Sequence, residues 1–536
     1  MDNNRTKVFA CALILIFVLT AVGCKSQTKT KKVDQNLNYN IIEEPENLDP
    51  AVNTTSSGKT IIGNIFEGLT TLNDKSKPVV GVAEKWNVSS DGTKYTFFLK
   101  KDAKWSDGKQ VKAYDFEYAW KRILNKNLGL KNAYKLYCLK NGEAYNNGSV
   151  SDNEVGVKAI DDSTLSVTLE KPMPNFLILT ASQICMPVRS DLVQGNSNWA
   201  TSDKTCIGNG PFMLKEWKKK EYIQLVKNSN YVDRKKVKLK KIKFTFETDS
   251  QKYYKKYNSD KLDIIASPPE EVKKEEVKVY KTLGVYFYAF NLNGNSQNKD
   301  IKAISDSKVR NAISISLNRK IITENILSDE EVPATSIIPS AIKDNEGKAF
   351  NSGYYSSTGD LEKAKKLLSE AGYENGKDFP KIKLIYLNEE KNKILAEEIK
   401  SMLKKNLNIE LETKGYDNNT FTSELANKNY TLVAFEVDAD YLDPIIFLDS
   451  FVTGRGSNIG GYNSEAYNNL IKEAKDENIQ YNKFSKMKMA QEIFMNDMPI
   501  IPICEPSIVV AQKQNVKGAY TTEFGVTYFK EAFKSE

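Results

Sequence analysis

The feature that most constrains the fold is an alternation of strand-like and helix-like patterns along the chain. Residues 382–387 form a short apolar run of strand length, and Leu395, Ile399, Met402 and Leu403 then recur at helical spacing. Strands that alternate with amphipathic helices indicate α/β domains, in which helices cover a sheet. Because 536 residues exceed what one core holds, we expect two or three domains.

The composition limits the chemistry that the chain can perform. It contains no histidine, so Ser-His-Asp and Cys-His catalysis and histidine-ligated metal sites are excluded. The net charge of +8 comes from 77 basic and 69 acidic residues scattered along the chain. No arginine-rich run is present, so we expect neither a nucleic-acid partner nor a cofactor.

The amino terminus has the pattern of a secretion signal, expected over residues 1–23. A positively charged start precedes an apolar run at 8–22, which is shorter than the roughly 20 residues that span a membrane. The run ends in Gly-Cys and resembles a bacterial lipobox, although Ala21 stands where Leu is usual. This resemblance implies cleavage before Cys24 and a lipid anchor on its thiol, which would hold the protein on the outer side of the cell membrane.

Residues 24–38 are polar and rich in lysine, so we expect a flexible tether between the anchor and the folded body. Four cysteines remain in that body: Cys138, Cys185, Cys206 and Cys504. Their spacing predicts no metal site, and it leaves the possibility of a disulfide open.

An acidic stretch near the carboxyl end is the main candidate for a binding site. Apolar and acidic residues alternate over 435–441, so Glu436, Asp438 and Asp440 are expected on one face of a strand. Acids two residues apart on a strand lie about 7 Å from each other and repel unless a positive group lies between them. We therefore expect this row to face a cationic ligand group. The alternative is a solvated edge strand that leads into an Asp-Pro turn.

Short motifs along nearly the whole body carry a family resemblance. They are EPENLDP (44–50), IIGNIFEGL (61–69), GVAEKW (81–86), KWSDG (104–108), GVKAIDD (156–162), GNGPF (208–212), KVRNA (308–312), AKKLLSEAGY (364–373) and MPIIP (498–502). Taken together and in this order, they resemble extracellular solute-binding protein family 5, the oligopeptide- and dipeptide-binding proteins of ABC importers.

The resemblance implies a type II periplasmic-binding-protein-like α/β fold, in which two hinged lobes close on a ligand. By analogy, the first lobe takes residues 34–68, 189–287 and 507–536, an extra inserted domain takes 69–188, and the second lobe takes 288–506. It also implies a monomer without enzymatic activity, which captures peptides and delivers them to the permease subunits of an ABC transporter.

The resemblance assigns roles to individual residues as well. In peptide-binding relatives, the Asp of an Asp-Tyr pair holds the α-ammonium group of the ligand, and the matching residue here is Asp440. Main-chain groups that would hydrogen-bond an extended peptide belong to Glu436, Val437 and Asp438 on one side and to Thr54, Thr55 and Ser56 on the other. Tyr134 matches another ligand-contacting tyrosine, and a partly buried aromatic residue without a ligand role is the alternative.

Some positions depart from the pattern of relatives. The Trp and Arg that relatives often carry before the Asp are Val437 and Ala434 here, so the carboxyl end of a peptide has no expected partner. This favours longer peptides, or a non-peptide ligand such as a metal chelate or an oligosaccharide. Glu436 and Asp438 would favour ligands with more than one positive charge. A further alternative is a glycoside hydrolase that uses Asp438 and Asp440.

Overall fold

The computed structural model describes residues 33–536, except 131, 325–330, 345, 352 and 440. The expected signal peptide and the anchor at Cys24 lie outside the described residues. Within the part of the chain that is described, no helix has the length and apolar character needed to cross a membrane. The expected tether, 24–38, extends too far, because strand β1 (Asn36–Asn40) already buries Leu37 and Tyr39.

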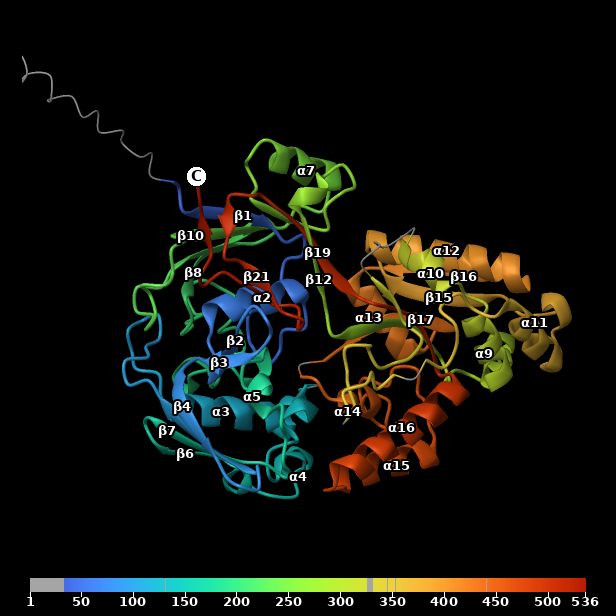
Figure 1. Cartoon of the computed structure of the whole chain (residues 1–536), viewed down its shortest axis with the longest axis horizontal. Coiled ribbons are helices and arrows are strands. Elements are labelled where there is room, and N and C mark those ends of the chain that lie inside the picture. Colours follow the sequence, from blue (N-terminus) through green and yellow to red (C-terminus); the bar gives the residue numbers. More distant parts are fainter. Residues whose placement is uncertain (1–32, 131, 325–330, 345, 352, 440) are drawn as a thin grey trace, which may run out of the picture.

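A seven-stranded mixed sheet forms the centre of the first lobe (Figure 1). In spatial order its strands are β12 (Val277–Lys281), β19 (Ser507–Gln512), β11 (Ile264–Ala266), β1, β10 (Lys241–Thr245), β9 (Tyr222–Lys227) and β8 (Phe212–Lys218). β1 runs parallel to β10 and β11, and the other neighbours are antiparallel.

The first lobe also contains short helices and two small strand pairs. Its helices are α2 (Ser56–Ile65), α6 (Ser190–Val193) and α7 (Ser250–Asn258), and the strand pairs near the carboxyl terminus are β20 (Val516–Lys517) with β23 (Phe533–Lys534) and β21 (Tyr520–Thr521) with β22 (Thr527–Tyr528). β1 and the carboxyl-terminal segment therefore come from opposite ends of the described chain and meet in one lobe.

A six-stranded mixed sheet forms the second lobe. In spatial order its strands are β14 (Val332–Pro333), β18 (Ile500–Glu505), β13 (Gly284–Phe290), β17 (Leu432–Asp438), β15 (Ile382–Leu387) and β16 (Leu411–Tyr416). Its helices are α8 (Lys299–Ser305), α9 (Ser307–Ile315), α10 (Arg319–Ile322), α11 (Leu361–Glu370), α12 (Glu390–Leu407), α13 (Asn418–Asn427), α14 (Pro444–Asp449), α15 (Glu465–Asp476) and α16 (Gln480–Asp497).

The strand and helix expected from the pattern after residue 382 are confirmed as β15 and α12. Leu395, Ile399 and Leu403 of α12 are fully buried. The boundary expected after residue 287 is wrong, because it would cut β13, whose seven residues all pair with β17. The chain instead passes between the lobes at Thr282–Leu283 and again at Pro506. Thr282 donates from its backbone N–H and its hydroxyl to the Pro506 carbonyl, at 3.1 and 2.8 Å.

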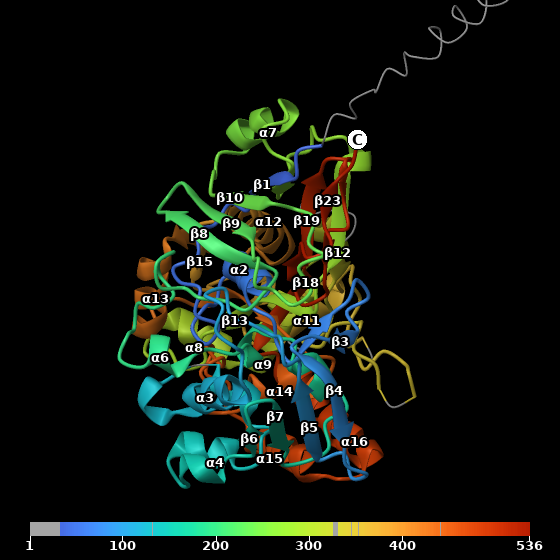
Figure 2. The same ribbon diagram turned by 90° about the vertical axis from the view of Figure 1, so that its left-hand side faces the viewer.

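A third unit lies below the first sheet in Figures 1 and 2, and we call it the inserted unit because its elements fall between α2 and α6 in the sequence. Its antiparallel sheet has the order β4 (Ala83–Val88), β5 (Lys94–Leu99), β7 (Thr164–Thr168) and β6 (Val157–Asp161). Its further elements are β2 (Thr70–Leu72), β3 (Pro78–Val80), α3 (Ala113–Leu124), α4 (Gly142–Asn147) and α5 (Phe176–Leu179).

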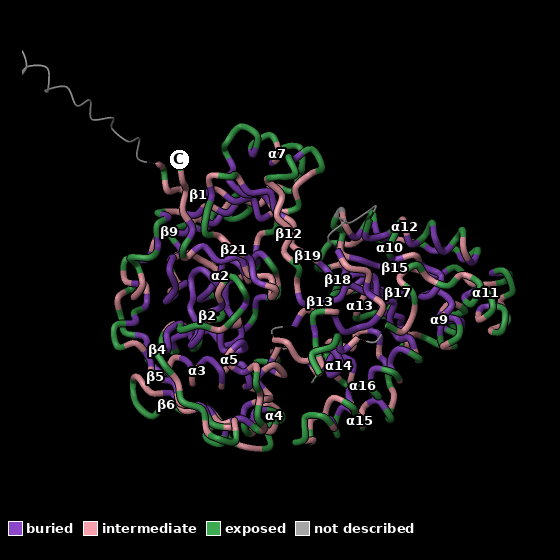
Figure 3. Tube along the Cα trace, viewed as in Figure 1, coloured by how far each residue is buried: buried purple, intermediate pink, exposed green. Residues whose placement is uncertain are grey.

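The buried residues divide the molecule into two bodies (Figure 3). One continuous core joins residues of the first sheet, such as Leu37 and Phe244, to residues of the inserted unit, such as Phe97 and Trp120. The second sheet has two cores of its own, one on each face, because alternate residues of β13 point to opposite sides. The first lobe and the inserted unit therefore form one body, and the second lobe forms the other.

A buried ion pair fastens the inserted unit to the first lobe. The Arg122 guanidinium donates to both carboxylate oxygens of Asp49, at 3.0 and 2.6 Å, and the Trp199 indole N–H donates to Asp49 Oδ2 at 3.0 Å. The Asp49 side chain is 7% exposed and that of Arg122 is 14% exposed. Since both charges are largely removed from water, each depends on the other.

We expect Asp49→Ala to destabilise the first body by about 3–5 kcal/mol, because it leaves the Arg122 charge buried without its partner. The measurement is thermal unfolding followed by circular dichroism, with Asp102→Ala, at an exposed turn position, as the matched control. Equal melting temperatures for the two variants would contradict the structural role of Asp49.

Candidate functional site

The acidic stretch forms the end of β17, a central strand of the second sheet. β17 lies between β13 and β15, so it is not an edge strand at 432–433, whereas over the acidic stretch its edge toward β15 is open, as the alternative of a solvated edge strand expects. Val433, Phe435 and Val437 contact the core on one face, and Glu436 points to the opposite face. Val437 is buried. The predicted alternation is confirmed over 435–438, and Asp440 lies outside the described residues.

One backbone edge of β17 lacks a strand partner at its acidic end. β15 pairs with β17 only at Leu432 and Val433, whereas β13 pairs with β17 as far as Asp438. Among the described residues, the backbone of 434–438 is therefore paired on one edge only. β15 and β17 are parallel, so this end is also the carboxyl edge of neighbouring parallel strands, where ligands bind in open α/β sheets.

The opposite flank lies at the start of α2 in the first lobe. The Thr55 side chain caps this helix, since its hydroxyl accepts from the Gly58 backbone N–H at 3.1 Å. The Asn53 side chain in turn accepts from the Thr55 hydroxyl at 2.9 Å. These contacts hold the loop in one conformation and leave Thr54 and Ser56 exposed.

An ion pair joins the two flanks. Lys59 Nζ of α2 lies 3.3 Å from Asp438 Oδ2 of β17. Gly284, opposite Asp438 in the ladder, allows this placement, because a Cβ at Gly284 would lie 2.6 Å from Asp438 Oδ1. The Lys59–Asp438 contact thus links α2 to the end of β17 across the lobes. We call the segments Thr54–Ser56 and Glu436–Asp438, together with Lys59, the inter-lobe site.

Glu436 is an acid of the inter-lobe site whose pKa lies above its usual range. Its side chain is open to solvent, yet protein atoms surround it densely, as expected for a group between two bodies. Burial and the neighbouring Asp438 carboxyl, with which it shares a hydrogen bond, raise the pKa of Glu436 to about 8, against the opposing effect of Lys391 and Lys59. Lys391 itself is paired with Glu331, at 2.9 Å.

Two further carboxyl groups approach each other between the lobes. Burial and the facing Glu389 carboxyl raise the pKa of Glu43, and burial raises the pKa of Glu389. Glu43 belongs to the first lobe and Glu389 precedes α12 of the second. The region therefore combines several carboxyl groups with two lysines, Lys59 and Lys391, each already paired with an acid.

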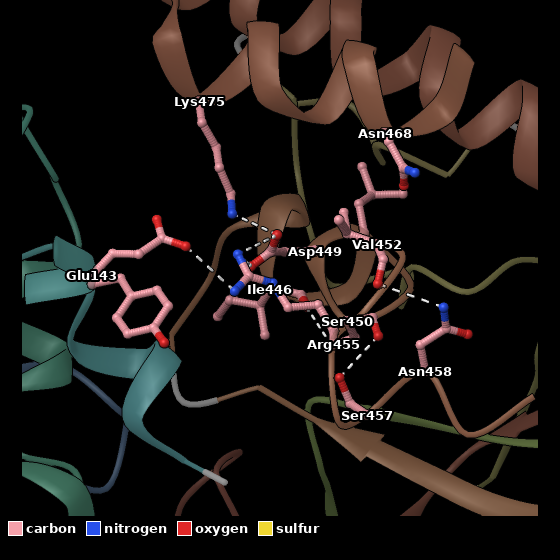
Figure 4. Close-up of polar contacts among 12 residues, drawn as sticks. Glu143, Ile446, Asp449, Ser450, Val452, Arg455, Ser457, Asn458, Asn468 and Lys475 are labelled. Atoms are coloured by element: carbon pink, nitrogen blue, oxygen red, sulfur yellow. Dashed lines mark hydrogen bonds and ion pairs between the residues drawn. The ribbon is translucent and has the colours of Figure 1, made fainter. Parts of the chain in front are cut away.

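A second group of cross-lobe contacts surrounds Arg455 (Figure 4). Arg455 Nη1 lies 3.6 Å from Glu143 Oε1 of the inserted unit, and Arg455 Nη2 lies 3.3 Å from Asp449 Oδ2 of its own lobe. The Arg455 guanidinium also lies over the Tyr137 ring, at 5.6 Å from the ring centre. Nearby, Lys171 pairs with Asp476 at 3.5 Å, and the Asn175 amide donates to the Leu442 carbonyl at 2.7 Å.

Tyr134 lies close in sequence to this second group. It belongs to a short 3-10 helix, Ala133–Leu136, and is half-buried. A ligand contact by Tyr134 and the alternative, a partly buried aromatic residue, both stay predictions. The four cysteines of the body are free thiols.

Sequence reasoning did not identify Lys59, Glu143 or Arg455. Each is a charged residue whose partner lies in a different unit of the fold, and no local pattern reports such pairing. Lys59 offered one weak signal, because it follows the predicted binding segment by one helical turn.

The comparisons with known proteins agree on one family. The chain matches the bacterial extracellular solute-binding proteins, family 5, over residues 77–458. It is 33% identical to the dipeptide-binding protein DppE of Bacillus subtilis, over 95% of this chain and 93% of DppE. It is also 33% identical to the oligopeptide-binding protein OppA of the same organism, over 99% of both chains.

Solved structures also show which arrangement the lobes adopt. The substrate-binding domain of an oligopeptide ABC transporter from Bacillus anthracis has a TM-score of 0.85 at 30% identity, covering 94% of this chain and 99% of that one. Two structures of the murein tripeptide-binding protein MppA of Escherichia coli also match, each at 30% identity over 94% of this chain. One has a TM-score of 0.84 and is covered to 99%. The other, the unliganded open form, has a TM-score of 0.66 and is covered to 97%. The present structure is therefore less similar to the open form of MppA than to the other MppA structure. Contacts of Lys59 and Arg455 join the two lobes here, and we call this arrangement closed.

We expect Glu143→Gln to weaken closure slightly, because it removes the charge that Arg455 contacts across the lobes. The Glu143 side chain is 52% exposed, and exposed pairs contribute about 0.2–1 kcal/mol. Small-angle X-ray scattering at low salt should give a larger radius of gyration than for Glu84→Gln, an exposed control in the same unit. Identical scattering curves for the two variants would exclude a contribution of Glu143 to closure.

Proposed function

Because the chain belongs to the bacterial extracellular solute-binding proteins of family 5, we propose that it captures peptides between its lobes and delivers them to the permease of an ABC importer. The observation that carries this proposal is the open backbone edge of β17 at residues 434–438, beside the Lys59–Asp438 contact between the lobes. An extended peptide can add to such an edge as a strand, and its main chain supplies the hydrogen bonds regardless of its sequence.

The amino end of the peptide has Asp440 as its expected partner. Asp440 would hold the α-ammonium group, because a carboxylate between two closed lobes binds a cation more strongly than one on an open surface. Support comes from its neighbours. Ala439 donates its backbone N–H to the Leu283 carbonyl at 2.8 Å, beside the hinge, and Tyr441 contacts the cores of both bodies.

The other ligand classes make different demands on this site. A metal chelate or an oligosaccharide is the alternative ligand for the same fold. Glycoside hydrolysis would require Asp438 as a free catalytic carboxyl group, and its ion pair with Lys59 supports a binding role instead. The relatives named above are binding proteins, and we propose that this chain likewise performs no catalysis.

The family is extracellular by its description, and the signal expected at 1–23 agrees with that location. We propose in addition that Cys24 carries a lipid that anchors a monomeric protein to the membrane. These proposals rest on the amino-terminal sequence and on the family.

Asp440→Ala should abolish the retention of peptides. Native mass spectrometry of wild-type protein, purified without denaturation, should show bound masses that match peptides. The variant should bind the same peptides about 2–5 kcal/mol more weakly, as expected when one partner of a desolvated charge pair is lost. Asp102→Ala serves as the control. A single non-peptide mass that stays bound to Asp440→Ala would contradict the proposal and show that the ligand belongs to another class.

Glu436 should couple binding of a basic peptide to the release of a proton. Its raised pKa, about 8, means that it is mostly protonated at pH 7, and a nearby ligand cation favours the ionised form. Affinity for a basic peptide should therefore rise between pH 6 and 8 and level off above pH 8.

Isothermal titration calorimetry at pH 7 in buffers of different ionisation enthalpy measures the released proton. Glu436→Gln should lower the number of protons released on binding. It should also reduce the ratio by which a peptide with lysine binds more tightly than the same peptide with norleucine. The amino group of the peptide also exchanges protons in this pH range. Because the same peptide is used with wild type and variant, that contribution is equal in both and cancels in the difference. An unchanged preference in Glu436→Gln and in Asp438→Asn would exclude a role for these acids in charge selection.

A further inference from the structure

A lysine-rich loop joins β9 to β10 at the end of the first lobe where the described chain begins. Over residues 227–243 the sequence carries eight basic residues and one acid. The Lys240 backbone N–H donates to the Gln35 carbonyl at 2.8 Å, and Lys241 lies opposite Asn36 in the ladder between β1 and β10. Figures 1 and 2 show β1, β10 and the carboxyl terminus at this same end of the lobe.

The packing of this loop turns its basic side chains outward. Val237 and Leu239 are buried in the core of the first body, at 1% and 0% exposed. Exposed and buried residues alternate here, so the lysines on either side of these two apolar residues lie at the surface. We define the basic face as the exposed residues of the loop with a positive charge: Arg234, Lys235, Lys236, Lys238 and Lys240.

The one acid of the loop does little to neutralise the basic face. Asp233 Oδ2 lies 3.7 Å from Lys100 Nζ, 3.4 Å from Lys236 Nζ and 3.5 Å from Lys530 Nζ, so three lysines share its single negative charge. Within the described part of the chain, the other four members of the basic face form no ion pair. The basic face therefore presents its positive charge to whatever lies outside this end of the lobe.

The amino-terminal segment keeps this end of the lobe near the membrane. Residues 24–32 separate the proposed lipid on Cys24 from Val33, and a chain of that length spans at most about 30 Å. A tether of this kind makes a second contact with the same membrane intramolecular, so that a weak attraction is enough to hold it. Beside an anionic lipid surface, each lysine or arginine strengthens binding by about fivefold.

We propose that the basic face rests on a phospholipid surface with anionic headgroups, in the membrane to which the chain is anchored. The contact would orient the first lobe, and it would leave the second lobe free to open and close, because that lobe contributes no residue to the basic face. The inference goes beyond the proposed peptide-binding function, and only its tether argument rests on the proposed lipid at Cys24.

The test uses the chain from Lys25 onward, which contains the whole described body and lacks the proposed anchor. Co-sedimentation should show binding to vesicles of phosphatidylcholine mixed with phosphatidylglycerol, and no binding to vesicles of phosphatidylcholine alone. Binding to the mixed vesicles should weaken steeply as salt is added, because the attraction is screened beyond a Debye length of about 8 Å at physiological ionic strength.

Two triple variants with the same change in net charge locate the contact. Neutralisation of three members of the basic face should weaken binding to the mixed vesicles by about tenfold or more: Arg234→Gln, Lys235→Gln and Lys240→Gln. The matched control neutralises three exposed lysines of the second lobe, in α8, α11 and α12, and should keep the wild-type affinity: Lys302→Gln, Lys366→Gln and Lys405→Gln.

Lys235→Gln alone should weaken binding by about fivefold, which keeps the test informative if the triple variant is unstable. An equal loss in the two triple variants would overturn the inference, because net charge alone would then explain the binding. Equal binding to both kinds of vesicle, or to neither, would also overturn it. Binding of a soluble polyphosphate without binding to the mixed vesicles would assign the basic face to an anionic polymer instead.

Peptide affinity, measured by calorimetry on the same proteins, separates this inference from the proposed function. The basic-face variants should bind peptides as tightly as wild type, because none of the substituted residues belongs to the inter-lobe site. A failure to bind vesicles thus leaves the peptide carrier intact, and a failure of wild-type protein to bind peptides leaves the membrane contact intact.

Discussion

The structure depends on the way in which two separately packed bodies are joined. The chain passes between them at Thr282–Leu283 and at Pro506, and the Thr282 hydrogen bonds to the Pro506 carbonyl hold the two crossings side by side. Because each body buries its own core, a rotation about these crossings exposes little apolar surface. The position of the lobes is consequently decided by a few contacts between the bodies, Lys59–Asp438 beside the crossings and Arg455–Glu143 in the inserted unit.

Those contacts explain why acids in the inter-lobe site are not equivalent. Asp438 faces Lys59 when the lobes are closed, so its charge is balanced by the protein itself. Glu436 lies one strand period away, where burial and Asp438 favour its neutral form. A ligand cation would thus meet one acid that is occupied by a lysine and one that can exchange its proton for that cation. Under the proposed function, the same row of carboxyl groups would serve closure at one position and ligand recognition at the next.

The sequence predicted much of the fold and only part of the site. Periodicity placed β15 and α12, and the alternation over 435–438 placed Glu436 and Val437 on opposite faces, because these patterns report local geometry. The boundary at 287 failed because β13 is apolar on both faces and the sequence does not show which sheet it joins. Lys59, Glu143 and Arg455 were missed for the same reason: their partners are brought close only by the closed arrangement, which no local pattern encodes.

The weakness of the cross-lobe pairs is consistent with a protein that must release what it captures. Glu143 and Asp438 remain 52% and 40% exposed at their side chains, so water competes for both ion pairs and each stabilises closure only modestly. Most of the free energy of closure then has to come from the ligand, through its backbone on the open edge of β17 and through the groups that it buries. A bound ligand would hold the lobes closed for longer, whereas an empty protein could open readily. Selectivity and release would therefore depend on the same few contacts.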